Sequence, residues 1–237
     1  MSFKKLAVFL LVPVFSLGMI FNQSAHAESY FGGSIGIALP SDVDDIKLSS
    51  GAATGSITDL DADNSFTYGF KIGHYFKSTP WLGIEINFQQ SDPDVDQQNA
   101  TATGTLGVFT AAATGQGRID VNHLTTIGFL AMLRPVEMKI YNLEPYLGLG
   151  LGVNIVSLGE GTAYSAAGVK SGAENLGSDT DVGFLLSAGL NYEITDHIKA
   201  YGEYKYTQSN FESTTGGVKY EYDVDGSTLM LGAAYNF

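Results

Sequence analysis

The sequence predicts an all-β fold, an eight-stranded antiparallel transmembrane β-barrel with short turns at one end and four long loops at the other. Three observations predict it. Eight segments of about ten residues alternate apolar with polar or glycine positions, the pattern of barrel strands that have one apolar face. The connections between these segments alternate between long and short. A basic and then apolar amino-terminal stretch has the form of a secretory leader, and no later stretch suits a membrane helix.

Residues 1–27 are predicted to be a cleaved signal peptide. Lys4 and Lys5 precede an apolar run over residues 6–20, and Ala-His-Ala at 25–27 fits the small-x-small pattern before a cleavage point. An uncleaved membrane anchor is the alternative, but this run is shorter than the roughly 20 residues that a spanning helix needs. We therefore expect residues 28–237 to form the barrel domain.

The first four predicted strands span residues 30–39, 67–76, 82–89 and 126–134. On one side of each segment the alternate residues are mostly apolar. In chain order they are Phe-Gly-Ile-Ile-Leu, Tyr-Phe-Ile-Phe, Leu-Ile-Ile-Phe and Ile-Phe-Ala-Leu. The opposite registers are rich in glycine and carry Tyr, Thr, Lys, Glu, Asn and Arg. Aromatic and β-branched residues on one face favour strands with that face against an apolar medium.

The last four predicted strands span residues 146–155, 182–193, 198–206 and 228–237. The first of them is the clearest, because Leu-Leu-Leu-Val-Ile alternates with Tyr-Gly-Gly-Gly-Asn. The other three alternate Val-Phe-Leu-Ala-Leu-Tyr, Ile-Ala-Gly-Tyr-Tyr and Leu-Leu-Ala-Tyr-Phe with mostly small or polar residues. Tyrosine and phenylalanine gather near the strand ends, as the interface girdles of a membrane barrel require.

Connection lengths separate a membrane barrel from a soluble β-sandwich, which also alternates. The long connections cover residues 40–65, 91–120, 157–181 and 208–226. The short ones cover residues 77–81, 135–142 and 195–197. A regular rhythm of short turns and long loops is typical of a membrane barrel.

Composition excludes several classes of function. Lys plus Arg is 12 against 25 Asp plus Glu, a formal net charge of −13 that argues against a nucleic-acid partner. The chain has no cysteine, which excludes disulfides, thiolate metal sites and a cysteine nucleophile. The long connections hold 18 acidic residues against four basic ones, so the charge belongs to the loop end. No motif predicts a cofactor.

Three motifs carry a family resemblance. They are Leu-Met-Leu-Gly-Ala-Ala-Tyr-Asn-Phe at 229–237, Glu-Pro-Tyr-Leu-Gly-Leu-Gly-Leu-Gly-Val at 144–153, and Glu-Tyr-Lys-Tyr at 203–206. With them the chain resembles the small outer-membrane β-barrels of the OmpA, OmpX and Opa type. The resemblance implies the outer membrane of a Gram-negative bacterium, with the turns in the periplasm and the loops outside. It also implies that Tyr235 and Phe237 belong to the signal read by the barrel-assembly machinery.

Eight strands enclose an interior just wide enough for side chains to fill. The inward register carries four basic and four acidic residues: Lys71, Arg134, Lys199 and Lys205, with Glu85, Glu144, Glu193 and Glu203. Buried charges are costly unless paired, so we expect internal ion pairs that close the lumen. Larger side chains must fill the space beside the inward glycines: Tyr30, Tyr75, Tyr146, Tyr201, Met132 and Met230. The alternative interpretation of the charges is a gated ion path.

The acidic loops offer weak candidates for a divalent cation site. Asp59, Asp61 and Asp63 alternate as in an EF-hand loop, and hard oxygen ligands suit Ca²⁺ or Mg²⁺. However, Asn64 replaces the turn glycine and Phe70 stands where the bidentate glutamate should be. We expect solvated loop charge, bridged by divalent cations to lipopolysaccharide phosphates, rather than a dedicated metal site.

The second long connection differs from the others because residues 100–115 are small, β-prone and uncharged. It either extends the third and fourth strands as a protruding hairpin or folds over the barrel mouth. In the hairpin form Leu106, Val108 and Phe109 lie at the tip, an apolar contact for a partner.

The resulting functional hypothesis is an outer-membrane surface protein with a plugged lumen and a structural, adhesive or other loop-mediated role. Its partners would be lipopolysaccharide and an extracellular ligand or host surface. The alternative is a narrow porin-like channel, or a route for small apolar solutes as in OmpW-like barrels. A lipid-acting enzyme ranks third, because His123-Leu-Thr125 only resembles the His-x-Ser pair of the lipid A deacylase type. We therefore predict no catalytic residues; His74 and His123 fall on outward registers, and His197 falls in a turn.

Overall fold

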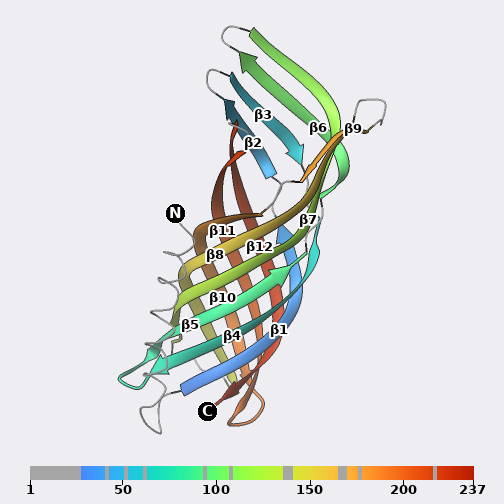
Figure 1. Ribbon diagram of the computed structural model, residues 1–237. Helices are drawn as coiled ribbons and strands as arrows, with labels where there is room; N and C mark the ends of the chain where they lie inside the picture. Colours follow the sequence, from blue (N-terminus) through green and yellow to red (C-terminus); the bar gives the residue numbers. More distant parts are fainter. Residues whose placement is uncertain are drawn as a thin grey trace.

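The computed structural model describes residues 28–40, 43–50, 53–60, 63–92, 95–106, 109–135, 141–164, 170–175, 178–215 and 218–237. Eight strands form a barrel wall (Figure 1): β1 (Glu28–Pro40), β4 (Ser65–Phe76), β5 (Thr79–Ser91), β7 (Phe109–Leu133), β8 (Leu143–Tyr164), β10 (Ser178–Glu193), β11 (Ile198–Thr215) and β12 (Val218–Asn236). The described residues include no helix of the length and apolarity needed to cross a membrane.

Pairing of the first wall strand with the last closes the barrel. β1 pairs antiparallel with β12, from Tyr30 opposite Asn236 to Pro40 opposite Gly226. The other neighbours in the order β1-β4-β5-β7-β8-β10-β11-β12 are also antiparallel. The predicted eight-stranded antiparallel barrel is confirmed, and each predicted segment falls on one of these strands.

Side chains of the wall strands alternate between the lumen and the outside, as the period-two pattern predicts. On β11, for example, Tyr201 faces inward and is 3% exposed, whereas Tyr204 faces outward and is 40% exposed. The outward face presents exposed large apolar residues on seven of the eight wall strands, among them Ile35, Phe70, Trp81, Leu149, Phe184, Leu231 and Tyr235. On β7 the outward apolar residues Ile127, Phe129 and Leu133 are half-buried. Such an apolar outer surface suits a wall that is surrounded by lipid.

Inside the wall, tyrosine rings lie over glycines of the neighbouring strand. Tyr30 is directly opposite Gly73, and Tyr146 is directly opposite Gly189. A Cβ atom on either glycine would come within 2.3 Å of the tyrosine Cζ atom, so only glycine leaves room for the ring. These close approaches explain why the inward register combines many glycines with a few large side chains.

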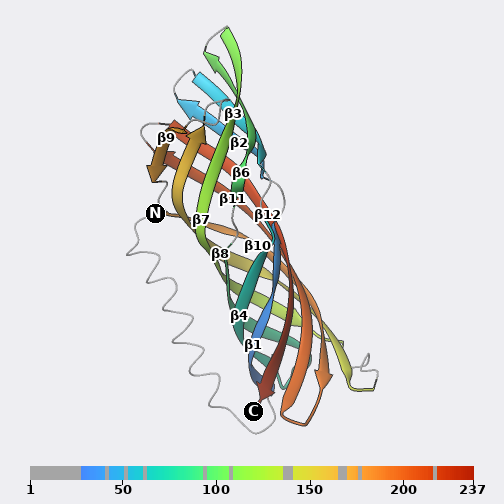
Figure 2. The same cartoon turned by 90° about the vertical axis from the view of Figure 1, so that its right-hand side faces the viewer.

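Four further strands extend the sheet beyond one end of the wall: β2 (Val43–Ser50), β3 (Ala53–Leu60), β6 (Val95–Leu106) and β9 (Lys170–Asn175). β6, β3 and β2 pair in that order between the outer parts of β7 and β12. β9 pairs with the outer part of β8. Figures 1 and 2 show this outer section at the end opposite the carboxyl terminus, where β2, β3 and β6 extend beyond the wall.

The outer section corrects the expectation that the long connections are plain loops. β7 begins at Phe109 rather than at residue 126, and β8 continues to Tyr164. Outside a membrane both faces of a strand meet water, so the apolar alternation that marked the wall is missing there. Of the two forms weighed for the second connection, the hairpin is found, with Leu106 opposite Phe109 where β6 turns into β7.

Candidate functional site

The lumen is the candidate functional site, because charged side chains from several wall strands meet inside it. They form two clusters. We call Lys71, Glu85, Glu203 and Lys205 the central cluster. We call Glu28, Arg134, Glu144 and Lys199, which lie near the short turns, the turn-end cluster.

The central cluster joins strands that are not neighbours in the wall. Lys71 Nζ on β4 lies 2.9 Å from Glu203 Oε2 on β11 and 3.8 Å from Glu85 Oε2 on β5. Lys205 Nζ lies 3.3 Å from the other oxygen of Glu203. All four residues are at most 5% exposed. The contact between Lys71 and Glu203 therefore spans the lumen in a place that water barely reaches.

Tyrosines complete the coordination of the central charges. The Tyr30 hydroxyl donates a hydrogen bond of 2.6 Å to Glu85, and the Tyr146 hydroxyl donates one of 2.7 Å to Glu203. Lys71 donates to the Tyr146 oxygen at 3.2 Å, and its ammonium lies 3.7 Å from the centre of the Tyr201 ring. Hydrogen bonds to charged groups and cation–π contacts are stronger than neutral contacts, especially away from water.

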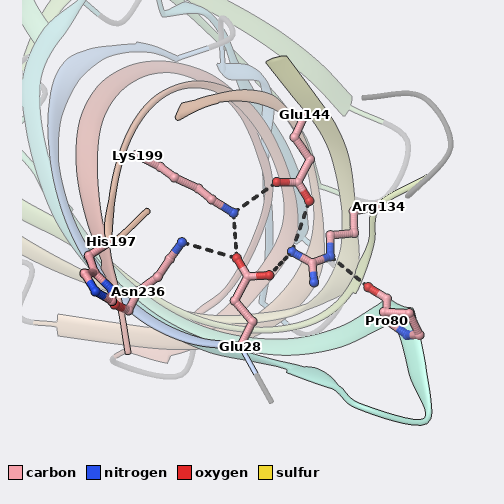
Figure 3. A network of polar contacts seen from close by, with 7 residues as sticks. All are labelled: Glu28, Pro80, Arg134, Glu144, His197, Lys199 and Asn236. Atoms are coloured by element: carbon pink, nitrogen blue, oxygen red, sulfur yellow. Dashed lines mark hydrogen bonds and ion pairs between the residues drawn. The ribbon is translucent and has the colours of Figure 1, made fainter. Parts of the chain in front are cut away.

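The turn-end cluster is a closed ring of alternating charges (Figure 3). Arg134 forms ion pairs with both Glu28 and Glu144, the second at 3.0 Å from Nη1 to Oε1. Lys199 Nζ lies 2.5 Å from Glu28 Oε1 and 3.0 Å from Glu144 Oε2. Figure 3 shows the four side chains converging inside the barrel from different parts of the wall.

Neighbouring groups hold the turn-end ring in position. Arg134 donates from Nε to the carbonyl oxygen of Pro80 at 2.8 Å, and its guanidinium lies 3.8 Å from the centre of the Tyr75 ring. The Asn236 side-chain amide donates to Glu28 Oε1 at 3.3 Å. The ring thus ties β1 and β12, where the barrel closes, to β7, β8 and β11.

Each cluster contains two basic and two acidic residues, so each is neutral as a whole. This balance is important for stability, because removing one partner of a buried ion pair destabilises a protein by about 3–5 kcal/mol. In a complete cluster each buried charge has an oppositely charged partner. A cavity of about 20 Å³, with Lys71, Tyr146, Glu28 and Lys199 in its lining, lies between the clusters. That volume has room for about one water molecule.

Glu28 is the member of the turn-end ring that the sequence interpretation missed. It lies two residues before Tyr30 in the same inward register, and it directly follows the predicted cleavage point. Extending the period-two pattern by one step would have found it. Glu193, which was predicted to be a member, is half-buried on β10 opposite Lys199 of β11.

The weak metal candidates are not brought together in the described part of the chain. Asp63 is exposed, Asp59 lies near the end of β3, and Asp61 is outside the described residues. Among the residues that the structure describes, no group of three or more His, Asp or Glu could hold a metal ion.

The other predicted positions lie at the two ends of the molecule. Tyr235 and Phe237 face outward, and their ring centres are 6.5 Å apart. The Phe237 backbone N–H donates to the Ser29 carbonyl at 2.9 Å, which continues the closure of β1 on β12. At the opposite end, Leu106 and Phe109 are paired in the backbone of the outer hairpin, and Val108 lies outside the described residues.

The three histidines that follow the predicted signal peptide lie in different places. His74 Nδ1 is 2.8 Å from Ser29 Oγ, and these residues are cross-strand partners in the pairing of β1 with β4. His197 lies in the turn between β10 and β11, where its ring stacks on Tyr235 at 5.8 Å. His123 is half-buried on β7, beside two register shifts in the pairing with β8.

Comparison with known proteins gives a match over nearly the whole chain. A family model described as "Outer membrane protein beta-barrel domain" matches residues 7–237. A comparison with curated protein sequences finds no match.

Comparison with solved structures finds other outer-membrane proteins. The outer membrane protein OprG of Pseudomonas aeruginosa is 16% identical and has a TM-score of 0.50, with 89% of this chain and 96% of that chain covered. Neisserial surface protein A is 14% identical, with a TM-score of 0.47 and coverage of 90% and 100%. The attachment invasion locus protein Ail of Yersinia pestis is 17% identical, with a TM-score of 0.39 and the same coverage. At these identities, the likeness to OprG speaks for the fold alone.

Proposed function

This chain belongs to the outer membrane protein β-barrel domain family, and we propose that it is a non-conducting surface protein whose outer section meets partners outside the cell. Family membership implies an outer-membrane location. The closed lumen, the partners and the adhesive or structural role are the proposal. Its main support is that two neutral ion-pair clusters fill the lumen one above the other.

Ion pairs across the lumen argue against a conducting path. A passing ion would have to part Lys71 from Glu203 in the central cluster and Lys199 from Glu144 in the turn-end cluster. If one such separation costs about 3–5 kcal/mol, an open central cluster is populated in about one molecule in 10² to one in 5 × 10³. Opening both clusters together is rarer still. The cavity between them holds about one water molecule, which is too little for a hydrated ion.

The outer section supports an interaction role. It continues four wall strands, β7, β8, β11 and β12, and adds β2, β3, β6 and β9 to them. Its long connections hold 18 of the chain's 25 acidic residues. Divalent cations bridging these acids to lipopolysaccharide phosphates would anchor the section at the membrane surface. Its far end would then contact an extracellular ligand or a host surface.

Two further parts of the proposal concern biogenesis. We infer that a signal peptidase cleaves after Ala27, which leaves Glu28 free to enter the turn-end ring. We also infer that the barrel-assembly machinery reads Tyr235 and Phe237. Their support is the small-x-small pattern at residues 25–27 and the outward, stacked position of the two terminal aromatic rings.

Solute flux and partner binding, measured on the same reconstituted protein, test this proposal. The purified chain is inserted into liposomes, insertion is checked by a heat-modifiable gel band, and swelling is followed in sugars and amino acids. We expect no swelling above empty liposomes. A variant that lacks residues 106–109 should insert equally well but lose binding to bacterial or host surfaces. Swelling by the intact chain would instead favour the narrow channel, the runner-up function.

A further inference from the structure

The pairing of β10 with β11 stops before the outer ends of these strands. It runs from Glu193 opposite Lys199 to Phe184 opposite Gln208. Beyond that point β11 continues to Thr215 in pairing with β12, while the chain before β10 forms β9 in pairing with β8. The outer part of β11 and the strand β9 therefore diverge from each other. We call these two segments, β9 (Lys170–Asn175) and residues 211–215 of β11, the fork.

A carboxylate marks the base of the fork. Asp181 Oδ2 accepts a hydrogen bond of 3.1 Å from the backbone N–H of Asn210, two residues beyond the last paired position of β11. Asp179 Oδ1 likewise accepts the backbone N–H of Thr180 at 2.8 Å. Side-chain acceptors thus replace the backbone carbonyls that a continued ladder would supply. The side chains of Asp179 and Asp181 therefore mark where the hydrogen-bonded pairing of β10 with β11 ends.

Above its base the fork offers two strand edges. Within the part of the chain that the structure describes, β9 pairs on one side only, with β8, and residues 211–215 pair on one side only, with β12. Figure 2 shows β9 at the border of the outer section, beside β8. An edge of five or six residues presents backbone N–H and C=O groups to which another extended chain can pair.

Charge decides which chain fits. Residues 157–181 and 208–226, which flank the fork, contain eight acidic residues against Lys170 and Lys219. A second copy of this protein would bring an equally acidic fork to the first, and like charges oppose strand pairing. A basic strand meets attraction instead. We propose that the fork binds an extended, positively charged peptide segment of about six residues through backbone pairing with its free edges.

This inference deepens the proposed surface role and rests on it. Its test uses the full chain in lipid nanodiscs and a capped hexapeptide of alternating Lys and Val as the probe. Amide hydrogen exchange, read by mass spectrometry, should show new protection in residues 170–175 and 211–215 when the peptide is added. The strands β2 and β3, on the other side of the outer section, should show no change.

Two control peptides separate backbone pairing from charge attraction. A copy that is N-methylated at every residue keeps the charges but has no amide donors, and we expect it to bind at least about tenfold more weakly. A Glu-Val copy keeps the donors but reverses the charge, and we expect it to give no protection. Equal binding of the N-methylated copy would overturn the proposal. Protection of the fork that grows with protein concentration alone would also overturn it, because the occupant would then be a second copy.

Matched variants test the position of the site. The double variant Glu174→Gln, Glu212→Gln removes one charge from each side of the fork. It should lower the affinity for the Lys-Val peptide by about fivefold. Asp45→Asn with Asp59→Asn removes two charges from β2 and β3 and should leave the affinity within about twofold. If both double variants lost the same amount of affinity for the peptide, the fork would not be the binding site. Measuring conductance separates the two proposals. A barrel that does not conduct and does not bind the peptide refutes the fork as a binding site but not the closed lumen. A barrel that conducts refutes the closed lumen.

Discussion

Replacing Glu203 by Gln removes one charge from the central cluster while the side chain keeps its size. Glu203 contacts Lys71 at 2.9 Å and Lys205 at 3.3 Å, and it accepts the Tyr146 hydroxyl at 2.7 Å. It is only 4% exposed, so the two lysines cannot turn to bulk water. Loss of one partner of a buried ion pair costs about 3–5 kcal/mol. We expect the lower part of that range, because Glu85 stays 3.8 Å from Lys71.

The free energy of unfolding in lipid vesicles measures this effect. Urea titration can be followed through Trp81, the one tryptophan of the sequence. The matched control adds Lys205→Met, which restores neutrality with a side chain of similar length. We expect the double variant to regain about 2 kcal/mol of the loss, a coupling that a double-mutant cycle isolates. A loss below about 1 kcal/mol for Glu203→Gln, or simple addition in the double variant, would refute the charge-pair account.

Other parts of the account give independent predictions. Gly73→Ala should lower the free energy of unfolding by about 1–3 kcal/mol, because its Cβ would meet the Tyr30 ring. The control Gly33→Ala should cost less than half as much, because a Cβ at that outward position has 3.7 Å of room. Equal losses of stability in the two variants would contradict the packing of tyrosine rings over glycines. Glu28→Gln should cost about 1.5–3 kcal/mol in the same titration, since two cations lose a charged acceptor, and no change would remove Glu28 from the ring. Phe237→Ala should reduce the heat-modifiable band in cells at unchanged synthesis, and an unchanged band would remove Phe237 from the assembly signal.

The wall of the barrel was predictable because the membrane imposes one rule on every wall strand. Lipid requires apolar residues at every second position, so segments such as 146–155 are visible in the sequence alone. The same rule assigns Lys71 and Glu203 to the lumen. Inside the lumen these charges form the central cluster and the turn-end cluster.

Individual contacts were harder to predict because they depend on which strands face each other across the lumen. Lys71 and Glu203 are 132 residues apart, and nothing local connects them. The outer strands escaped prediction for a different reason. β3, with the sequence Ala-Thr-Gly-Ser-Ile-Thr-Asp-Leu, carries no apolar alternation, because pairing with β2 and β6 rather than burial against lipid makes it a strand.

Planar-bilayer conductance of the purified, refolded chain tests the closed lumen most directly. Insertion must be shown independently, by the heat-modifiable band of the same preparation, so that silence is informative. The account predicts no unitary openings from inserted barrels, because both ion-pair clusters stay closed. Stable unitary openings whose size changes when Lys71 or Glu203 is replaced would contradict it and would make the lumen a channel.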